Sequence, residues 1–345
     1  MSESNSEKPF AAVIPRITGT TSAVSSSLII YIICRSEKKL STIYHRIMFA
    51  MSCADIMSSI AMALTTLPMP NESVCEGEDF WEGRLGNIQT CEAQAFFLFF
   101  GVFTMFAYNG MLCTYYACAI AFQMKENTIR KYVEPFLHLS ALAFGLANSV
   151  LPLVRKTFNA GPNVAWCTIR ISQCRESRQY STLIIIPQII FFFSLILTSF
   201  GLIMWRTCKI DGVLASVPRT QSSQQRNNND SDDENKISQL EDAVSKHQTI
   251  KVVTKQALAY VITFLLCLTF PLIRNISDDE DLSIFAAYMQ LGLLPLQGFF
   301  NFLIFVSHKV YNYKRVYGED SYCAILRKYF CESDMVEPIL FSSLS

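Results

Sequence analysis

One ionisable side chain in this sequence lies in the middle of an apolar stretch. Asp55 follows Ala54 within the largely apolar residues 46–68. If that stretch crosses a membrane, a carboxylate near its centre costs about 2.5–3.5 kcal/mol, so it should face the protein interior and have hydrogen-bond partners there. Two interpretations stay open for Asp55: an ion-binding or conformational-switch site, or a hydrogen-bonded structural carboxylate.

Uncharged polar side chains recur in the other apolar stretches. They belong to Tyr108, Asn109, Tyr115, Tyr116, Asn148 and Asn301, and His138 adds an imidazole. Between membrane helices such groups usually hydrogen-bond across the packing interface. We expect this role for the amides and hydroxyls, and we expect His138 to be satisfied by a neighbour in the fold.

The apolar stretches themselves predict the fold. Apolar residues make up 51% of the 345 residues and are concentrated in seven stretches. Each is long enough for the hydrocarbon core of a bilayer, which takes roughly 20 helical residues. The stretches are 11–34, 46–68, 92–124, 135–154, 181–206, 252–274 and 283–307. They lack the period-two alternation of lipid-facing strands, so each should satisfy its backbone as a helix. The sequence predicts an all-α membrane protein, a bundle of seven transmembrane helices.

Four prolines fall within these spans. Pro152, Pro187, Pro271 and Pro295 belong to spans four to seven. Proline removes a backbone donor and tends to kink a helix. Kinked helices can open a cavity and act as hinges. We therefore place the default ligand site between the outer halves of spans three to seven.

The distribution of basic residues predicts the orientation. With the N-terminus outside, 20 of the 29 lysines and arginines fall in three cytosolic loops and the tail, and acidic residues dominate two outer loops. This asymmetry follows the positive-inside rule. One outer loop, with Arg155, Lys156 and Arg170, opposes it. Sequons at Asn71 and Asn275 fall outside and predict glycosylation there. We expect a multi-pass protein of the plasma membrane.

Spans and orientation divide the chain into three parts. Residues 1–10 form an outer arm, 11–307 the seven-helix domain and 308–345 a cytosolic tail. The third cytosolic loop, about 211–246, is polar and of low complexity and should be disordered. Basic and aromatic residues alternate after span seven, which predicts a short amphipathic helix along the membrane lipids. Cys323 and Cys331 in the tail are predicted palmitoylation sites.

Four cysteines lie in the outer loops or at the outer tip of span three: Cys75, Cys91, Cys167 and Cys174. The outer compartment is oxidising, so disulfides are expected there. Four cysteines allow three connectivities. We favour Cys91–Cys167, which ties the top of span three to the loop after span four and leaves Cys75–Cys174 as the second bridge.

Together these features resemble those of G-protein-coupled receptors. Seven spans, Cys91 at the tip of span three and Pro271 in span six support the resemblance, and Ala54-Asp55 is similar to the rhodopsin-like class. Gln297-Gly298-Phe299 in span seven and Trp166-Cys167 in the second outer loop instead resemble secretin-like and slime-mould cyclic-AMP-type receptors. The resemblance extends over residues 11–330.

Three departures from the rhodopsin-like pattern affect activation. Tyr115-Tyr116-Ala117 replaces the Asp-Arg-Tyr motif at the end of span three. Span seven has no Asn-Pro-x-x-Tyr, and span six has Leu268-Thr269-Phe270-Pro271 in place of Cys-Trp-x-Pro. The arginine lock of that class is therefore missing here.

The resemblance implies a heterotrimeric G protein as the cytosolic partner. Agonist binding would shift spans five and six, which a ligand can do only by binding the open state more tightly than the closed one. Carried over to this sequence, the coupling residues are Lys125, Arg130, Lys251, Lys255 and Lys309. The short outer loops of mixed charge favour a small extracellular molecule over a folded hormone as the ligand.

Other functions find less support. The 29 basic and 29 acidic residues balance, which does not suggest a nucleic-acid partner. Residues 283–307 contain no lysine for a retinal Schiff base, and the chain shows no paired carboxylates or His-Glu-x-x-His pattern, so we expect no enzyme, metal or other cofactor. A small transporter or channel is the main alternative, although it would normally show inverted repeats and more midplane charges than Asp55.

Overall fold

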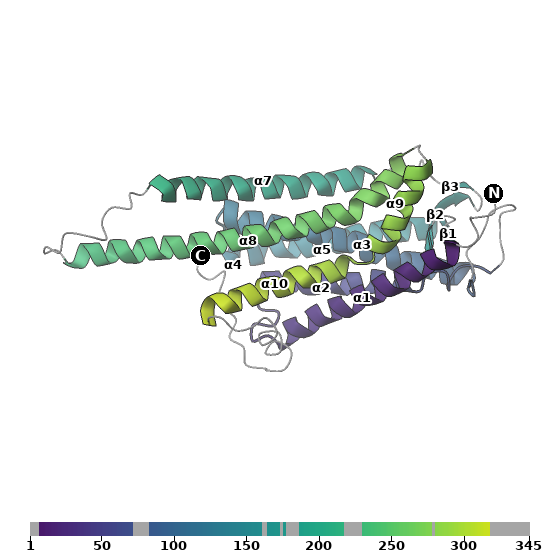
Figure 1. The fold of residues 1–345 in the computed structure, drawn as a ribbon, viewed down its shortest axis with the longest axis horizontal. Helices are drawn as coiled ribbons and strands as arrows, with labels where there is room; N and C mark the ends of the chain where they lie inside the picture. The colour runs from purple at the N-terminus through teal and green to yellow at the C-terminus, as the bar shows by residue number, and fades with distance from the viewer. Residues whose placement is uncertain are drawn as a thin grey trace.

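Membrane-length helices make up most of the protein in its computed structural model (Figure 1). The structure describes residues 7–71, 83–160, 164–172, 175–176, 186–216, 230–277 and 280–317. Within these residues, six helices can each cross a membrane, and a bent pair of helices provides a seventh span. The prediction of an all-helical bundle with seven spans is confirmed.

The helices follow the predicted spans closely. They are α1 (Glu7–Arg35), α2 (Ile43–Ala63), α3 (Ile88–Tyr116), α5 (Glu134–Val154), α7 (Ile186–Ser216), α8 (Asp230–Ile276) and the pair α9 (Glu280–Leu293) and α10 (Gln297–Tyr317). Between α3 and α5 the chain forms two π-helical turns, Ala117–Ala121 and Ile129–Val133, on either side of the short α4 (Glu126–Thr128).

Polar residues define where two of the central helices begin. Thr42 precedes α2, and its hydroxyl accepts a hydrogen bond from the backbone N–H of His45. Asn87 and Thr90 form a capping box at the start of α3, in which each side chain binds the other residue's backbone N–H. These bonds satisfy donors that a helix N-terminus otherwise leaves unpaired.

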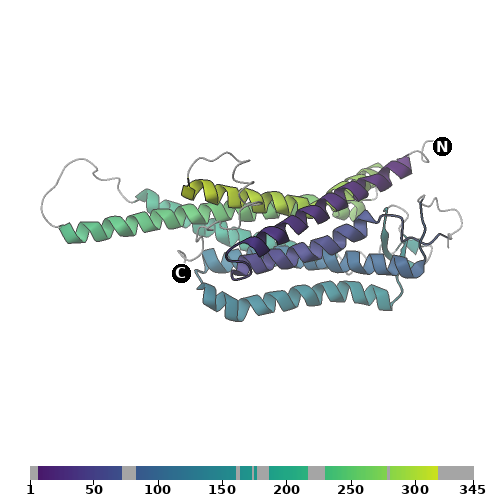
Figure 2. The same ribbon diagram turned by 90° about the horizontal axis from the view of Figure 1, so that it is seen from below.

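Helix α3 is the centre of the bundle, and small residues let its neighbours approach it closely. Figure 2 shows α5 along one flank and α8 with α10 along the other, with α2 and α3 between them. A Cβ atom at Gly101 of α3 would lie 2.6 Å from the backbone oxygen of Ala54 in α2. A Cβ atom at Gly145 of α5 would overlap the side chain of Thr104 in α3. Small residues commonly allow such close helix packing in membranes.

A small antiparallel sheet covers one end of the bundle. It contains β1 (Phe158–Ala160), β2 (Cys167–Ser172) and β3 (Arg175–Glu176), in the order β1-β2-β3. Phe158 and Trp166 are buried, and the Phe158 ring packs against Phe99 of α3 at 5.4 Å. The start of α1 lies near this sheet, whereas α10 ends far from it (Figure 1). We call this the disulfide end and the other the opposite end.

The seventh predicted span consists of two helices that meet at a bend. Helices α9 and α10 meet at 51° across Leu294-Pro295-Leu296, where Pro295 lacks a backbone donor. Helix α10 then continues unbroken to Tyr317 because residues 299–317 contain neither proline nor glycine. The short amphipathic helix predicted after residue 307 therefore stays a prediction: within the described residues, α10 includes residues 308–317 without a break.

The predicted disordered loop at 211–246 is also largely helical. Helix α7 runs to Ser216, and α8 begins at Asp230. Residues 230–250 contain no proline or glycine, and four of the first five are acidic, which favours a helix N-terminus. At ~1.5 Å per residue, the 47 residues of α8 extend roughly 70 Å, well beyond a hydrocarbon core of about 30 Å. The prediction of disorder stays open only for residues 217–229, which lie outside the described residues.

Candidate functional site

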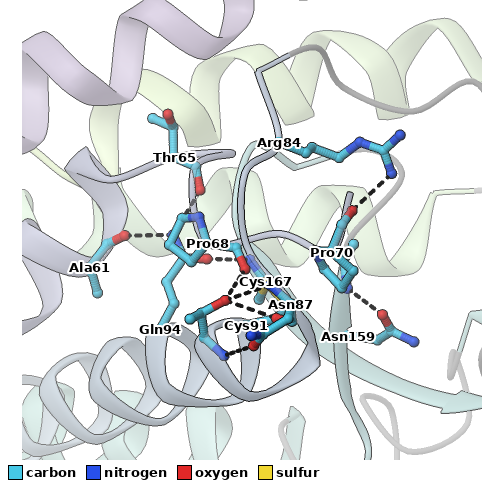
Figure 3. Close-up of a disulfide and its surroundings, with 12 residues drawn as sticks. Ala61, Thr65, Pro68, Pro70, Arg84, Asn87, Cys91, Gln94, Asn159 and Cys167 are labelled. Carbon is cyan, nitrogen blue, oxygen red and sulfur yellow. Dashed lines mark hydrogen bonds between the residues drawn. A yellow bond between two sulfur atoms is a disulfide. The ribbon is translucent and has the colours of Figure 1, made fainter. Parts of the chain in front are cut away.

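A disulfide joins the first turn of α3 to the first residue of β2. Cys91 and Cys167 are bonded, with their Cα atoms 5.5 Å apart, and both are completely buried (Figure 3). This confirms the pairing that we favoured from the sequence. Cys75 and Cys174, predicted as the second bridge, lie outside the described residues.

Gln94 organises the same region, and the sequence analysis missed it. Its Nε2 donates to the backbone oxygens of Ala61 and Thr65 at the end of α2, both at 2.8 Å, and its Oε1 accepts from the N–H of Cys167 at 3.1 Å (Figure 3). One side chain therefore ties α2, α3 and β2 together. The available signal was an amide one turn after Cys91, at the start of the apolar part of the helix.

Replacing Gln94 by leucine should destabilise the protein by about 1–3 kcal/mol, because three buried backbone groups lose their partner. The measurement is the free energy of unfolding in detergent or lipid nanodiscs. Phe97→Leu provides the control, since Phe97 lies on the same helix but is half exposed. Equal stability of the Gln94→Leu variant and the native protein would contradict this role.

Asp55 lies in the bundle interior, as its burial cost requires. Its Oδ2 accepts hydrogen bonds from the hydroxyls of Ser26 at 2.7 Å, Ser22 at 3.1 Å and Ser59 at 3.3 Å. Ser22 in turn accepts from the backbone N–H of Gly298 at 2.9 Å. The carboxylate thus connects α1, α2 and the start of α10, and we call Asp55 with Ser22, Ser26 and Ser59 the Asp55 cluster. The serines of α1 were not predicted, because their spacing from Asp55 carries no local signal.

The side-chain amides of spans three and seven that the sequence singled out are buried but incompletely hydrogen-bonded. Among the described residues, Asn109 donates only to the backbone of its own helix, at Met105, and its Oδ1 has no partner. Gln297 is 0% exposed, and neither polar atom of its amide has a partner within the described part of the chain; Oδ1 of Asn301 also lacks one there. Buried polar groups without partners are costly.

Two charged residues anchor the loops at the opposite end. Arg46 of α2 binds both carboxylate oxygens of Glu134 in α5, with Nη2 2.7 Å from Oε2, and also donates to the backbone of Leu40 and Ser41. Glu134 lies 3.6 Å from Nε2 of His138, whose Nδ1 is 2.9 Å from the Tyr108 hydroxyl. His138 is therefore satisfied, as expected.

Four of the five predicted coupling residues are exposed at the opposite end. Lys125 and Arg130 lie between α3 and α5, and Lys251 and Lys255 lie on α8. Lys309 differs: its side chain is 7% exposed and its Nζ is 3.3 Å from Nε2 of His45. The coupling role of Lys309 stays a prediction; in this structure α10 continues as a helix that turns this residue towards α2.

Comparisons with known proteins identify the fold. No family model matches the sequence, and no curated protein matches it. Among solved structures, squid rhodopsin matches over 95% of this chain and 86% of its own, with a TM-score of 0.60 and 9% sequence identity. The fold is rhodopsin-like. At this identity the likeness establishes the architecture of a multi-pass membrane protein, which the buried Asp55 and the disulfide fit.

Several predicted sites of the rhodopsin-like bundle stay predictions. Asn71 is exposed at the disulfide end, and Asn275 belongs to the last turn of α8. Pro271 lies inside α8 without ending that helix. Cys323 and Cys331 lie outside the described residues. The ligand cavity between the outer halves of spans three to seven also stays a prediction.

Proposed function

We propose that this protein is a G-protein-coupled receptor of the plasma membrane. It transmits the binding of a small extracellular molecule to a cytosolic heterotrimeric G protein. The observation that carries the proposal is a rhodopsin-like bundle with exposed cations, Lys125, Arg130, Lys251 and Lys255, at the end opposite the disulfide. The positive-inside distribution assigns that end to the cytosol and the N-terminus to the outside.

The lengths of α7 and α8 support this function. Both helices continue beyond their membrane-spanning windows, which end at Ile210 in α7 and begin at Ile250 in α8. A small rotation within the membrane therefore produces a larger displacement on the cytosolic side. An agonist drives such a movement by binding the open arrangement more tightly than the closed one. The opened crevice then accommodates Gα.

The receptor subtype is part of the same proposal. Gln297-Gly298 at the start of α10 supports a relation to the cyclic-AMP-type and secretin-like receptors, in which the pair belongs to span seven. Its position is consistent with a structural role, because the N–H of Gly298 binds Ser22 in the Asp55 cluster. The ligand would bind between the outer halves of the spans, beneath the sheet that carries Cys167.

Reversing the charges on α8 tests the coupling. In membranes that contain the receptor and purified Gα subunits, we expect Lys251→Glu with Lys255→Glu to reduce agonist-independent Gα association roughly tenfold, a loss of about 1.4 kcal/mol. The physical reason is that exposed charges at an interface control electrostatic attraction between the partners. Association would be measured as guanine-nucleotide exchange and by co-purification.

The control is Arg155→Glu with Lys156→Glu, the same charge change on exposed residues at the disulfide end. It should leave Gα association unchanged. If native receptor binds none of the Gα classes but carries solute flux in sealed vesicles, the protein is instead a transporter or channel.

A further inference from the structure

A buried, uncharged hydrogen-bonded cluster connects three helices at the opposite end. It consists of Tyr44 and Met48 from α2, Tyr116 from α3, and Gln256 and Tyr260 from α8. We call it the Tyr44 cluster. Of its members, only Tyr116 stood out in the sequence, since the others are 68 or more residues away from it in the chain.

The hydrogen bonds of the Tyr44 cluster form one directed chain. Tyr116 donates to Oε1 of Gln256 at 3.2 Å, and Nε2 of Gln256 donates to the Tyr44 hydroxyl at 2.7 Å. The Tyr44 and Tyr260 hydroxyls are 3.4 Å apart, and Tyr260 donates to the sulfur of Met48 at 3.4 Å. Because Tyr260 uses its proton on Met48, Tyr44 donates to Tyr260. Each hydroxyl proton is then used once.

Ring packing makes Tyr44 the centre of the cluster. Its ring stacks with that of Tyr116 at 6.3 Å and with that of Phe305 of α10 at 6.2 Å. Tyr44 therefore contacts α3, α8 and α10 at once. Gln256 holds the bridging position: its amide binds α3 through one end and α2 through the other, so α8 cannot move outwards while both bonds remain.

We propose that the Tyr44 cluster is an uncharged conformational lock that holds α8 against α2 and α3 and is broken at Gln256 when the receptor activates. This inference rests on the proposed function. It supplies a restraint where the sequence has Tyr115-Tyr116-Ala117 and no arginine lock. A hydrogen-bonded lock depends little on salt, because it contains no ion pair for salt to screen.

The lock favours the closed state by an amount that a ligand can overcome. An equilibrium between two conformations shifts by the free-energy difference between them. Removing the amide of Gln256 eliminates its two hydrogen bonds and leaves the Tyr116 and Tyr44 hydroxyls without this partner. In the open arrangement these groups lie apart, so losing the hydrogen bonds destabilises the closed state alone.

Gln256→Leu tests the lock, since leucine keeps an apolar side chain of similar size without the amide. Gln123 and Gln248 are both exposed, and each would be replaced by a genetically encoded keto amino acid that carries a spin label. The distance between the two labels in nanodiscs reports the separation of the end of α3 from α8. We expect the distance distribution to shift to longer values without agonist. Basal nucleotide exchange on Gα should rise roughly 5- to 30-fold, the factor that corresponds to 1–2 kcal/mol.

Tyr108→Phe is the matched control. It removes a buried hydroxyl from the same helix, α3, but that hydroxyl binds His138 of α5 and not α8. It should lower stability without changing the label distances or basal exchange. If Gln256→Leu does not fold, Tyr116→Phe decides the question, because it removes only the hydroxyl that binds Gln256.

Two outcomes separate the lock from the proposed function. An unchanged distance distribution in a folded Gln256→Leu or Tyr116→Phe variant overturns the lock, even if Gα coupling is established. A longer label distance with no nucleotide exchange on any Gα class supports the lock and removes the G protein as its output. The same distance shift in Tyr108→Phe would show that any loss of packing on α3 moves α8, and it would also overturn the proposal.

Discussion

Replacing Cys91 and Cys167 together by alanine should lower the free energy of unfolding by about 2–4 kcal/mol. The bond joins residues 76 positions apart, so it closes a long loop of the unfolded chain and removes much of its conformational entropy. It also holds the sheet of β1 and β2 on α3, where Phe158 packs against Phe99. Without it, the sheet should detach at a lower temperature than the helices.

The control for this prediction is a second double variant, Cys34→Ala with Cys208→Ala. Both of these cysteines are free and exposed. The melting temperature in nanodiscs, measured with and without a reductant, distinguishes the two variants. Reductant should lower the melting temperature of the native protein and of the control by more than that of the Cys91/Cys167 variant, which retains only the predicted Cys75–Cys174 bridge. A native melting temperature that does not respond to complete reduction would contradict the prediction.

Gly298→Ala should cost about 1–3 kcal/mol, the usual penalty for overpacking a tight interior. A Cβ atom at this position would overlap Oδ2 of Asp55 and Oγ of Ser26, which lie on two other helices. Helix α10 must then move away from α1 and α2, and the bond from Gly298 N–H to Ser22 weakens. The expected results are a lower free energy of unfolding and, if the Asp55 cluster transmits activation, altered agonist potency.

Gly292→Ala is the control for the alanine substitution. Its Cβ would meet only Ile14, at an ordinary contact distance of 3.7 Å. Because alanine favours helix more than glycine does, this variant should be neutral or slightly more stable. Asp55→Ala in the Gly298→Ala background removes the side chain that the new Cβ atom would overlap. The losses of unfolding free energy from the two substitutions should therefore be less than additive. Strict additivity would show that the Gly298 effect does not come from contact with Asp55.

The Asp55 and Tyr44 clusters restrain the same bundle in different ways. Asp55 connects α1, α2 and α10 through a carboxyl oxygen that accepts from three serine hydroxyls. The Tyr44 cluster connects α2, α3 and α8 through neutral groups. Helix α2 belongs to both, so a displacement of α10 at Gly298 can reach α8 through α2. Double variants of Gly298 and Gln256 would measure that coupling directly.

The sequence by itself determined which segments cross the membrane and that they are helices. This follows from one-dimensional properties: the length of each apolar run and the need of every backbone group in lipid to be bonded within its own segment. The same reasoning places Asp55 inside the bundle, because its burial cost allows no lipid-facing position. Position along the chain also favoured the Cys91–Cys167 pair.

Only the tertiary structure decided which side chains meet. The N–H of Gly298 donates to the hydroxyl of Ser22, 276 residues away, and the amide of Gln256 donates to the hydroxyl of Tyr44, 212 residues away. Such pairs depend on the rotation of each helix about its axis and on its offset along the membrane normal. Neither is fixed by hydropathy, since packing against neighbouring helices sets both. For the same reason, hydropathy did not show that the unbroken α10 buries Lys309 beside His45.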